Sequence, residues 1–186
     1  MKILAWTWQK LLGILKIPYP SLSIIENTIK KKTPARRYHQ MNRVKLMEEL
    51  KYDEGCIYEV YNDHLGYATF GVGHLIKNSD PEFGEDVGIS VSKERVTECF
   101  NQDIDIVCRE LDRSLPWWRG LTDNRRRILA NMCFNLGYPR LSGFKNFLGA
   151  LENEDWDKAA EEMMDSKWAD QVGPRAQRLR DRVLED

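Results

Sequence analysis

Residues 52–74 combine a helix end with two short strands that are joined by a polar turn. Gly55 fits the end of a helix, because glycine enters the left-handed backbone region at no steric cost. Residues 56–62 are rich in β-branched and aromatic side chains and predict a strand, and residues 67–72 predict the returning strand. A β-hairpin is therefore expected directly after a helix.

Two carboxylates lie in this stretch, Glu54 at the helix end and Asp63 at the turn. Cleavage of a glycosidic bond needs one protonated carboxyl group, which protonates the leaving oxygen, and one ionised group, which activates water or stabilises the sugar cation. Glu54 against an apolar body suits the first role, and Asp63 beside water suits the second. Taken alone, a turn-forming Asp63 and a surface Glu54 are the simpler interpretation, because such residues flank turns and helix ends in many proteins.

Helices are expected on both sides of the hairpin. Before Gly55, Val44, Met47 and Leu50 recur at helical spacing and predict an amphipathic helix. Ser92 is suited to cap a long helix that follows the hairpin. The predicted helices cover residues 42–52, 93 to about 111, 122 or 123 to 137, 142–151 and 156 to about 166, with a last one beginning at Pro174. A small β lobe inserted in a helical body gives an α+β fold.

Residues 1–40 differ from the rest of the chain in charge. They carry eight basic side chains and one acidic one, a net +7, whereas residues 41–186 carry 20 basic and 28 acidic side chains, a net −8. We therefore expect a basic N-terminal extension over residues 1–40 and a separate domain over residues 41–186. The extension is suited to an anionic lipid or polymer surface, or it is a solvated leader.

Residues 3–17 form a short apolar segment in which Lys2, Gln9 and Lys16 recur every seven residues. A helix here would suit the plane of a membrane surface. A signal peptide is the competing interpretation, but polar residues interrupt the apolar region and no Ala-x-Ala-like cleavage site follows. A helix packed on the body, or a leader without a role, would also fit this segment. The extension has no recognised nucleic-acid-reading motif, so no nucleic-acid partner is expected.

The four cysteines are Cys56, Cys99, Cys108 and Cys133. They lack Cys-x-x-Cys spacing and histidines in register, so neither a metal site nor a cofactor is expected. The last three lie in apolar helical patterns and predict buried thiols. A chain of this length folds without disulfides, which favours reduced cysteines and synthesis in the cytosol.

A series of motifs follows in order along most of the chain. They are Asp53-Glu54-Gly55, Tyr61-x-Asp63-x-x-Gly66-Tyr67-x-Thr69-x-Gly71-x-Gly73-His74-Leu75, Phe100-Asn101-Gln102-Asp103, Asn131-Met132-x-Phe134-x-x-Gly137, Gly143-Phe144, Trp156-Asp157-x-Ala159-Ala160, Ser166-x-Trp168 and Gln171-x-x-x-Arg175-Ala176-x-Arg178. This order resembles the phage-type lysozymes, the endolysins of the T-even phage kind. The likeness covers roughly residues 41–183, and it implies a small β-hairpin lobe joined by a long helix to a helical lobe.

The resemblance implies roles for three residues of the hairpin region. Glu54 matches the general acid, Asp63 the group that activates or orients the attacking water, and Thr69 a residue that helps hold this water. The implied reaction is hydrolysis of the β-1,4 bond between N-acetylmuramic acid and N-acetylglucosamine in bacterial peptidoglycan. Inversion of the anomeric carbon would depend on the carboxylate separation. A wall-binding module without turnover and a lytic transglycosylase are the competing functions. Retention of Glu54, Asp63 and Thr69 together disfavours the first, and the presence of a second carboxylate disfavours the second.

The resemblance also implies residues that contact the substrate. Leu75 and Phe134 match residues lining the sugar cleft. Phe147 stands where a Ser is usual and Glu162 where an Asn is usual, so saccharide subsites there are expected to differ. Arg175 matches the arginine that pairs with the catalytic glutamate; the competing interpretation is an Arg on a helix surface, where ion pairs contribute little.

His74 matches a histidine that pairs with an aspartate of the long helix, here Asp103. A structural ion pair is expected rather than a catalytic histidine, with a raised pKa and with part of the stability lost as pH rises through it. We expect a monomer that is made in the cytoplasm of the bacterial host cell and acts on the wall after release. Lysis of the host, penetration by a virion and defence against bacteria all fit these expectations.

Overall fold

The computed structural model describes residues 40–185, which belong to the second of two units of the chain, residues 38–186. The membrane-surface helix expected over residues 3–17 and the rest of the basic extension lie outside the described residues. Within residues 40–185, no helix is long and apolar enough to cross a membrane.

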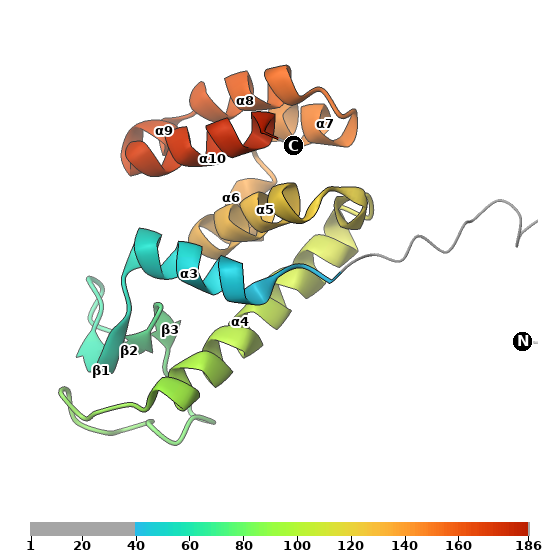
Figure 1. The fold of residues 1–186 in the computed structure, drawn as a ribbon. Helices are drawn as coiled ribbons and strands as arrows, with labels where there is room; N and C mark the ends of the chain where they lie inside the picture. Colours follow the sequence, from blue (N-terminus) through green and yellow to red (C-terminus); the bar gives the residue numbers. More distant parts are fainter. Residues whose placement is uncertain (1–39, 186) are drawn as a thin grey trace, which may run out of the picture. The chain divides into compact units, whose positions relative to one another are not determined.

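The described residues form a small antiparallel sheet and a larger set of helices, joined through helix α4 (Figure 1). The elements are α3 (Arg43–Glu54), β1 (Ile57–Asn62), β2 (Ala68–Gly71), β3 (His74–Leu75), α4 (Lys93–Ser114), a 3₁₀ turn η1 (Trp118–Gly120), α5 (Asp123–Leu136), α6 (Tyr138–Leu141), α7 (Lys145–Glu152), α8 (Trp156–Met164), α9 (Lys167–Val172) and α10 (Pro174–Leu184). The lysozyme-like α+β fold expected from the sequence is therefore confirmed.

Local capping explains where several of these helices begin and end. The side chain of Ser92 accepts a hydrogen bond from the backbone amide of Arg95, and Thr122 caps α5 in the same way. Gly55 has a φ of 82° at the end of α3, and Gly137 has a φ of 72° at the end of α5. Both helix stops therefore use a positive φ, as the sequence predicts.

Helix α4 connects the two parts of the body because its buried face changes partners along its length. Val96 and Cys99, near its N-terminal end, pack in a small core with Val60 and Phe70 of the sheet. From Phe100 onward its buried side chains belong to the main helical core. One helix thus supports both the sheet and the helical lobe.

The main core corrects one expectation about α3. Val44 was expected on the apolar face but is 71% exposed, whereas Leu46 and Leu50 are fully buried. These two leucines are four residues apart and lie on one face of the helix, which is the face that packs on the core. The inward face is therefore set by Leu46 and Leu50.

Several elements differ from the sequence expectations. Strand β3 and helices α6 and α9 were not predicted, and the helix expected over residues 142–151 begins only at Lys145, as α7. Within residues 40–185 all four cysteines are free, and Cys99, Cys108 and Cys133 are buried, as expected.

Candidate active site

Glu54 is the last residue of α3, and two side chains from other helices hold its carboxylate. Arg175 of α10 donates from Nη1 to Glu54 Oε1 over 2.6 Å, and Asn135 of α5 donates from Nδ2 to the same oxygen over 3.0 Å. The side chain of Glu54 is 27% exposed. Both of these contacts fall on Oε1, and neither involves Oε2.

Asn135 is itself oriented by a neighbour. The indole Nε1 of Trp168, on α9, donates to Asn135 Oδ1 over 2.9 Å. This bond directs the amide nitrogen of Asn135 toward Glu54, since an amide has its acceptor and its donors at different atoms. No motif in the sequence pointed to Asn135. Its one signal was its place four residues after Asn131 on α5, which puts both on one helix face.

A buried ionic network fixes Arg175 beside Glu54. Arg175 is 6% exposed and donates from Nη2 to Asn131 Oδ1 over 2.8 Å. Its Nε lies 3.3 Å from Asp53 Oδ2, and Arg178 binds the other oxygen of Asp53. Asn131 in turn donates to Asp53 over 2.9 Å. The guanidinium of Arg175 is therefore shared between two carboxylates and held in one orientation.

Asp63 occupies a different environment, at the turn after β1. Its Oδ1 accepts hydrogen bonds from the backbone amides of Leu65 and Tyr67, each over 2.8 Å. The amide of Tyr67 is the main cause of a pKa below the usual value for Asp63, with smaller contributions from the amides of Leu65 and Gly66, while partial desolvation opposes the shift. Asp63 is thus an ionised carboxylate beside water.

Tyr61, Thr69 and Leu75 form a row across one face of the sheet. Thr69 pairs with Tyr61 on β1 and with Leu75 on β3, and directly paired residues share a face. Thr69 is 4% exposed and donates from Oγ1 to the carbonyl of Tyr67 over 2.9 Å. Leu75 is 47% exposed, so this row offers an apolar surface beside the Asp63 turn.

The phenol of Tyr61 lies close enough to both carboxylates to feel their charge. Its pKa is raised first by burial and then by negative charge, from Asp63, Cys56 and Glu54 in turn. Both carboxylates therefore lie within Coulombic range of the same phenol. Tyr61 appeared in the sequence only as part of a motif, without an assigned role.

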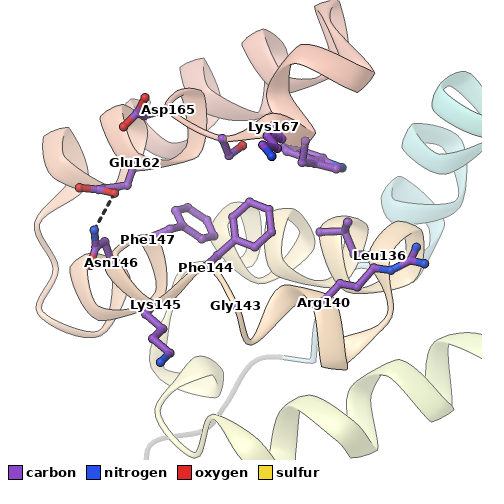
Figure 2. Close-up of a pocket in the computed structure, with 12 residues that line it drawn as sticks. Leu136, Arg140, Gly143, Phe144, Lys145, Asn146, Phe147, Glu162, Asp165 and Lys167 are labelled. Carbon is purple, nitrogen blue, oxygen red and sulfur yellow. Dashed lines mark hydrogen bonds between the residues drawn. The ribbon is translucent and has the colours of Figure 1, made fainter.

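Phe147 and Glu162 lie in a pocket of about 630 Å³ (Figure 2). Helices α6 and α7 form one side of this pocket, and α8 and α9 form the other. Phe147 is only 1% exposed. Glu162 accepts a hydrogen bond from Asn146 over 3.0 Å and pairs with Lys158 at 3.0 Å. The pocket is lined by Leu136, Arg140, Gly143, Phe144, Lys145, Asn146, Phe147, Glu162, Asp165, Ser166, Lys167 and Trp168.

This pocket is separate from the sheet row but shares Trp168 with the Glu54 network. Phe134, the other aromatic expected in the cleft, is partly buried against the main core, with its ring centroid 6.2 Å from that of Phe100. The structure thus brings Glu54 and Arg175 into direct contact and places Phe147 and Glu162 together in the neighbouring pocket.

His74 lies on the opposite face of the sheet from Thr69 and is 4% exposed. Its Nδ1 is 2.7 Å from Asp103 Oδ2, which is the expected ion pair, and its Nε2 is 3.4 Å from Asp80 Oδ2. Burial of the ring opposes protonation, but Asp103 and Asp80 outweigh it and raise the pKa of His74. A raised pKa means that this pairing stabilises the fold below the ring's usual pKa and is lost as pH rises through the raised one.

The fold is lysozyme-like, with two carboxylates in unlike surroundings beside the sheet. The sequence profile of the phage lysozyme family matches residues 51–185 of this chain. The probable T4-type lysozyme 2 of Dictyostelium discoideum is 33% identical over 153 aligned positions, and the match covers 72% of this chain and 90% of that protein. This chain belongs to the phage lysozyme family.

Two phage proteins are also similar. The pre-baseplate central spike protein of Enterobacteria phage T4 is 30% identical over 152 aligned positions, and the match covers 72% of this chain and 26% of that protein. A peptidoglycan hydrolase of Pseudomonas phage phiKMV is 29% identical over 133 aligned positions, and the match covers 70% of this chain and 14% of that protein. In both cases the matching region is one part of a much longer chain.

Proposed function

We propose that this protein hydrolyses bacterial peptidoglycan as a muramidase, cleaving the β-1,4 bond between N-acetylmuramic acid and N-acetylglucosamine. The main support is that two carboxylates near the phenol of Tyr61 lie in different surroundings. Glu54 is held by Arg175 and Asn135, and Asp63 is kept ionised by backbone amides. Glycosidic hydrolysis requires such a pair, one acid and one base.

In the proposed reaction, Glu54 gives a proton from Oε2 to the glycosidic oxygen as the bond to the anomeric carbon breaks. Asp63 takes a proton from the water that attacks this carbon, and Thr69 helps to hold that water. The carboxylate formed on Glu54 is stabilised by the guanidinium of Arg175 and the amide of Asn135, which already contact Oε1. Solvent then returns a proton to Glu54 and removes one from Asp63.

Substrate contacts are proposed on both sides of Glu54. Leu75 offers an exposed apolar surface on the sheet. The pocket between α6–α7 and α8–α9 has an aromatic wall and charged side chains at its rim, including Glu162 and Lys167. Such a combination suits a polymer that carries both apolar and charged groups. Because Phe147 is almost fully buried, its proposed contribution is to shape the wall of this pocket.

Mass spectrometry of the products tests the reaction class. Purified peptidoglycan digested by a muramidase yields fragments with a reducing N-acetylmuramic acid end that carries the added water. A lytic transglycosylase would instead yield an anhydro sugar, lighter by one water. A non-catalytic wall-binding module would yield no fragments while still sedimenting with the polymer. Either of the last two results would contradict the proposal.

A further inference from the structure

A second group of polar side chains, separate from the Glu54 network, meets on the side of the sheet where His74 lies. His74, Asp80 and Cys99 each offer one donor atom, and the three donor atoms all lie within 4.8 Å of one another. They come from β3, from the loop that follows it and from α4. The side chain of Cys99 is fully buried, and that of Asp80 is 10% exposed. Three different kinds of donor therefore meet in a mostly buried position that Asp80 opens partly to solvent.

These three donors are those that zinc prefers. Imidazole nitrogen, carboxylate oxygen and thiolate sulfur bind Zn²⁺ at about 2.0–2.3 Å in tetrahedral geometry, which places neighbouring donor atoms roughly 3.3–3.8 Å apart. The distance from His74 Nε2 to Asp80 Oδ2 is 3.4 Å. This separation is long for a hydrogen bond but matches two ligands of one zinc ion.

The groups around the cluster orient its donors. Asp103 Oδ2 lies 2.7 Å from His74 Nδ1, an arrangement that fixes the ring so that Nε2 faces Asp80. Asp80 is held by Arg95 Nη2 at 3.0 Å on Oδ1 and by the backbone amide of Lys77 at 2.7 Å on Oδ2. Ligands held in this way need little reorganisation when an ion binds.

We propose that His74, Asp80 and Cys99 form a zinc-binding site that fastens the loop after β3 to helix α4. Binding releases the thiol proton of Cys99 and, where the ring is doubly protonated, the Nε2 proton of His74. The thiolate of Cys99 and the carboxylate of Asp80 then balance the charge of the ion. These three donors leave one position of the tetrahedral ion for a water molecule, as in zinc sites with three protein ligands. The cysteine spacing predicted no such site because the donors come from three separate elements.

Spectroscopy on the full-length protein tests the site directly. The protein is freed of metal with a chelator and titrated with Co²⁺, whose bond to a thiolate produces a charge-transfer absorption band. We expect one Co²⁺ per chain, displaced by Zn²⁺, and loss of the band in Cys99→Ser. Cys108→Ser and Cys56→Ser are the controls, because Cys108 is a buried thiol of the same helix and Cys56 a more accessible one.

A second variant keeps the test decisive if Cys99→Ser does not fold. Asp103→Asn removes the charge that orients His74 while leaving all three donors, so it should keep the band and weaken Co²⁺ affinity about 10- to 100-fold. Circular dichroism verifies that each variant is folded. Absence of a thiolate band in the wild type, its loss in Cys56→Ser or Cys108→Ser, or unchanged affinity in Asp103→Asn would overturn the proposal.

Discussion

At the scale of single residues, the position of Glu54 depends on a chain of hydrogen bonds that begins at Trp168. The indole donates to Asn135, and Asn135 donates to Glu54. Without the indole donor, the oxygen of the Asn135 amide loses its partner, so the amide nitrogen is less firmly directed at Glu54. Trp168 thus acts on Glu54 through Asn135.

Trp168→Phe is therefore expected to lower kcat on soluble peptidoglycan fragments severalfold while costing only about 1 kcal/mol of stability. An aromatic ring is retained, so the packing against Phe144 should largely persist. Trp156→Phe is the matched control, because the ring of Trp156 stacks on Arg125 and a phenyl ring preserves that contact. Equal kcat for the wild type and Trp168→Phe would show that the hydrogen-bond chain has no part in the reaction.

Phe147 is mainly a core residue, whereas the sequence comparison with the family placed it at the sugar cleft. Its side chain is 1% exposed and belongs to the main core. Phe147→Ala should reduce the free energy of unfolding by about 3–5 kcal/mol, as for other buried aromatic side chains. Phe147→Leu should cost much less, because it leaves a smaller cavity. Urea denaturation measures both, and a loss under about 1 kcal/mol for the alanine variant would refute the core role.

At the scale of elements, the C-terminal end of α4 is attached to η1 by one carboxylate. Asp112 accepts hydrogen bonds from Trp118 Nε1 over 2.7 Å and from Arg119 Nε over 2.7 Å. Arg119 is the main cause of a pKa for Asp112 below its ordinary 3.8, with burial opposing and Trp118 adding to the shift. A lowered pKa stabilises the fold above the ordinary value, and this contribution is lost as pH falls through the folded-state pKa.

Asp112→Asn should therefore lower the melting temperature slightly at neutral pH, by the equivalent of about 1 kcal/mol or less, because the carboxylate is 44% exposed. The difference from the wild type should shrink once the pH falls below 3.8. Calorimetry across this pH range provides the measurement, with Asp86→Asn in the exposed loop as the control. A difference that stays constant down to acid pH would exclude the ionic origin.

The elements also show how much of the fold could be predicted from the sequence. Ser92, Gly55 and Gly137 predicted helix limits correctly because caps act through neighbouring backbone atoms. Val44 was assigned to the wrong face because a three-residue spacing on a short helix fits more than one face. Helix α9 was missed because it has only six residues. It begins at a serine cap that resembles any turn.

Contacts between residues far apart in the sequence were the part of the site that could least be predicted. The pairing of Glu54 with Arg175 spans 121 residues, and it was expected only through the family resemblance. Asn135 and Asp80 were not anticipated, because a single sequence carries no signal of which distant side chains meet. Their roles follow from the way α5 and the loop after β3 pack against neighbouring elements.

At the scale of the whole molecule, charge divides the chain into a net +7 over residues 1–40 and a net −8 over residues 41–186. Peptidoglycan is anionic, so the acidic body gains no electrostatic attraction to it. We propose that residues 1–40 provide this attraction to the cell envelope.

A chain that begins at Met41 should then clear intact bacterial cells more slowly than the full chain at low salt. It should cleave soluble fragments equally well, since diffusion to a small substrate does not depend on envelope binding. The gap on cells should narrow as salt is added, because screening beyond about 10 Å is strong at 0.1 M ionic strength. Equal rates on cells at low salt would eliminate this role for the extension.

If Glu54 is the acid of a peptidoglycan-cleaving site, replacing it should slow the loss of turbidity of a peptidoglycan suspension. Glu54→Gln keeps the shape of the side chain and removes the proton donor, so the rate should fall about a hundredfold or more. Glu152→Gln, at the exposed end of α7, should clear the suspension at the wild-type rate. A folded Glu54→Gln protein that clears peptidoglycan as fast as the wild type would show that Glu54 is not the acid.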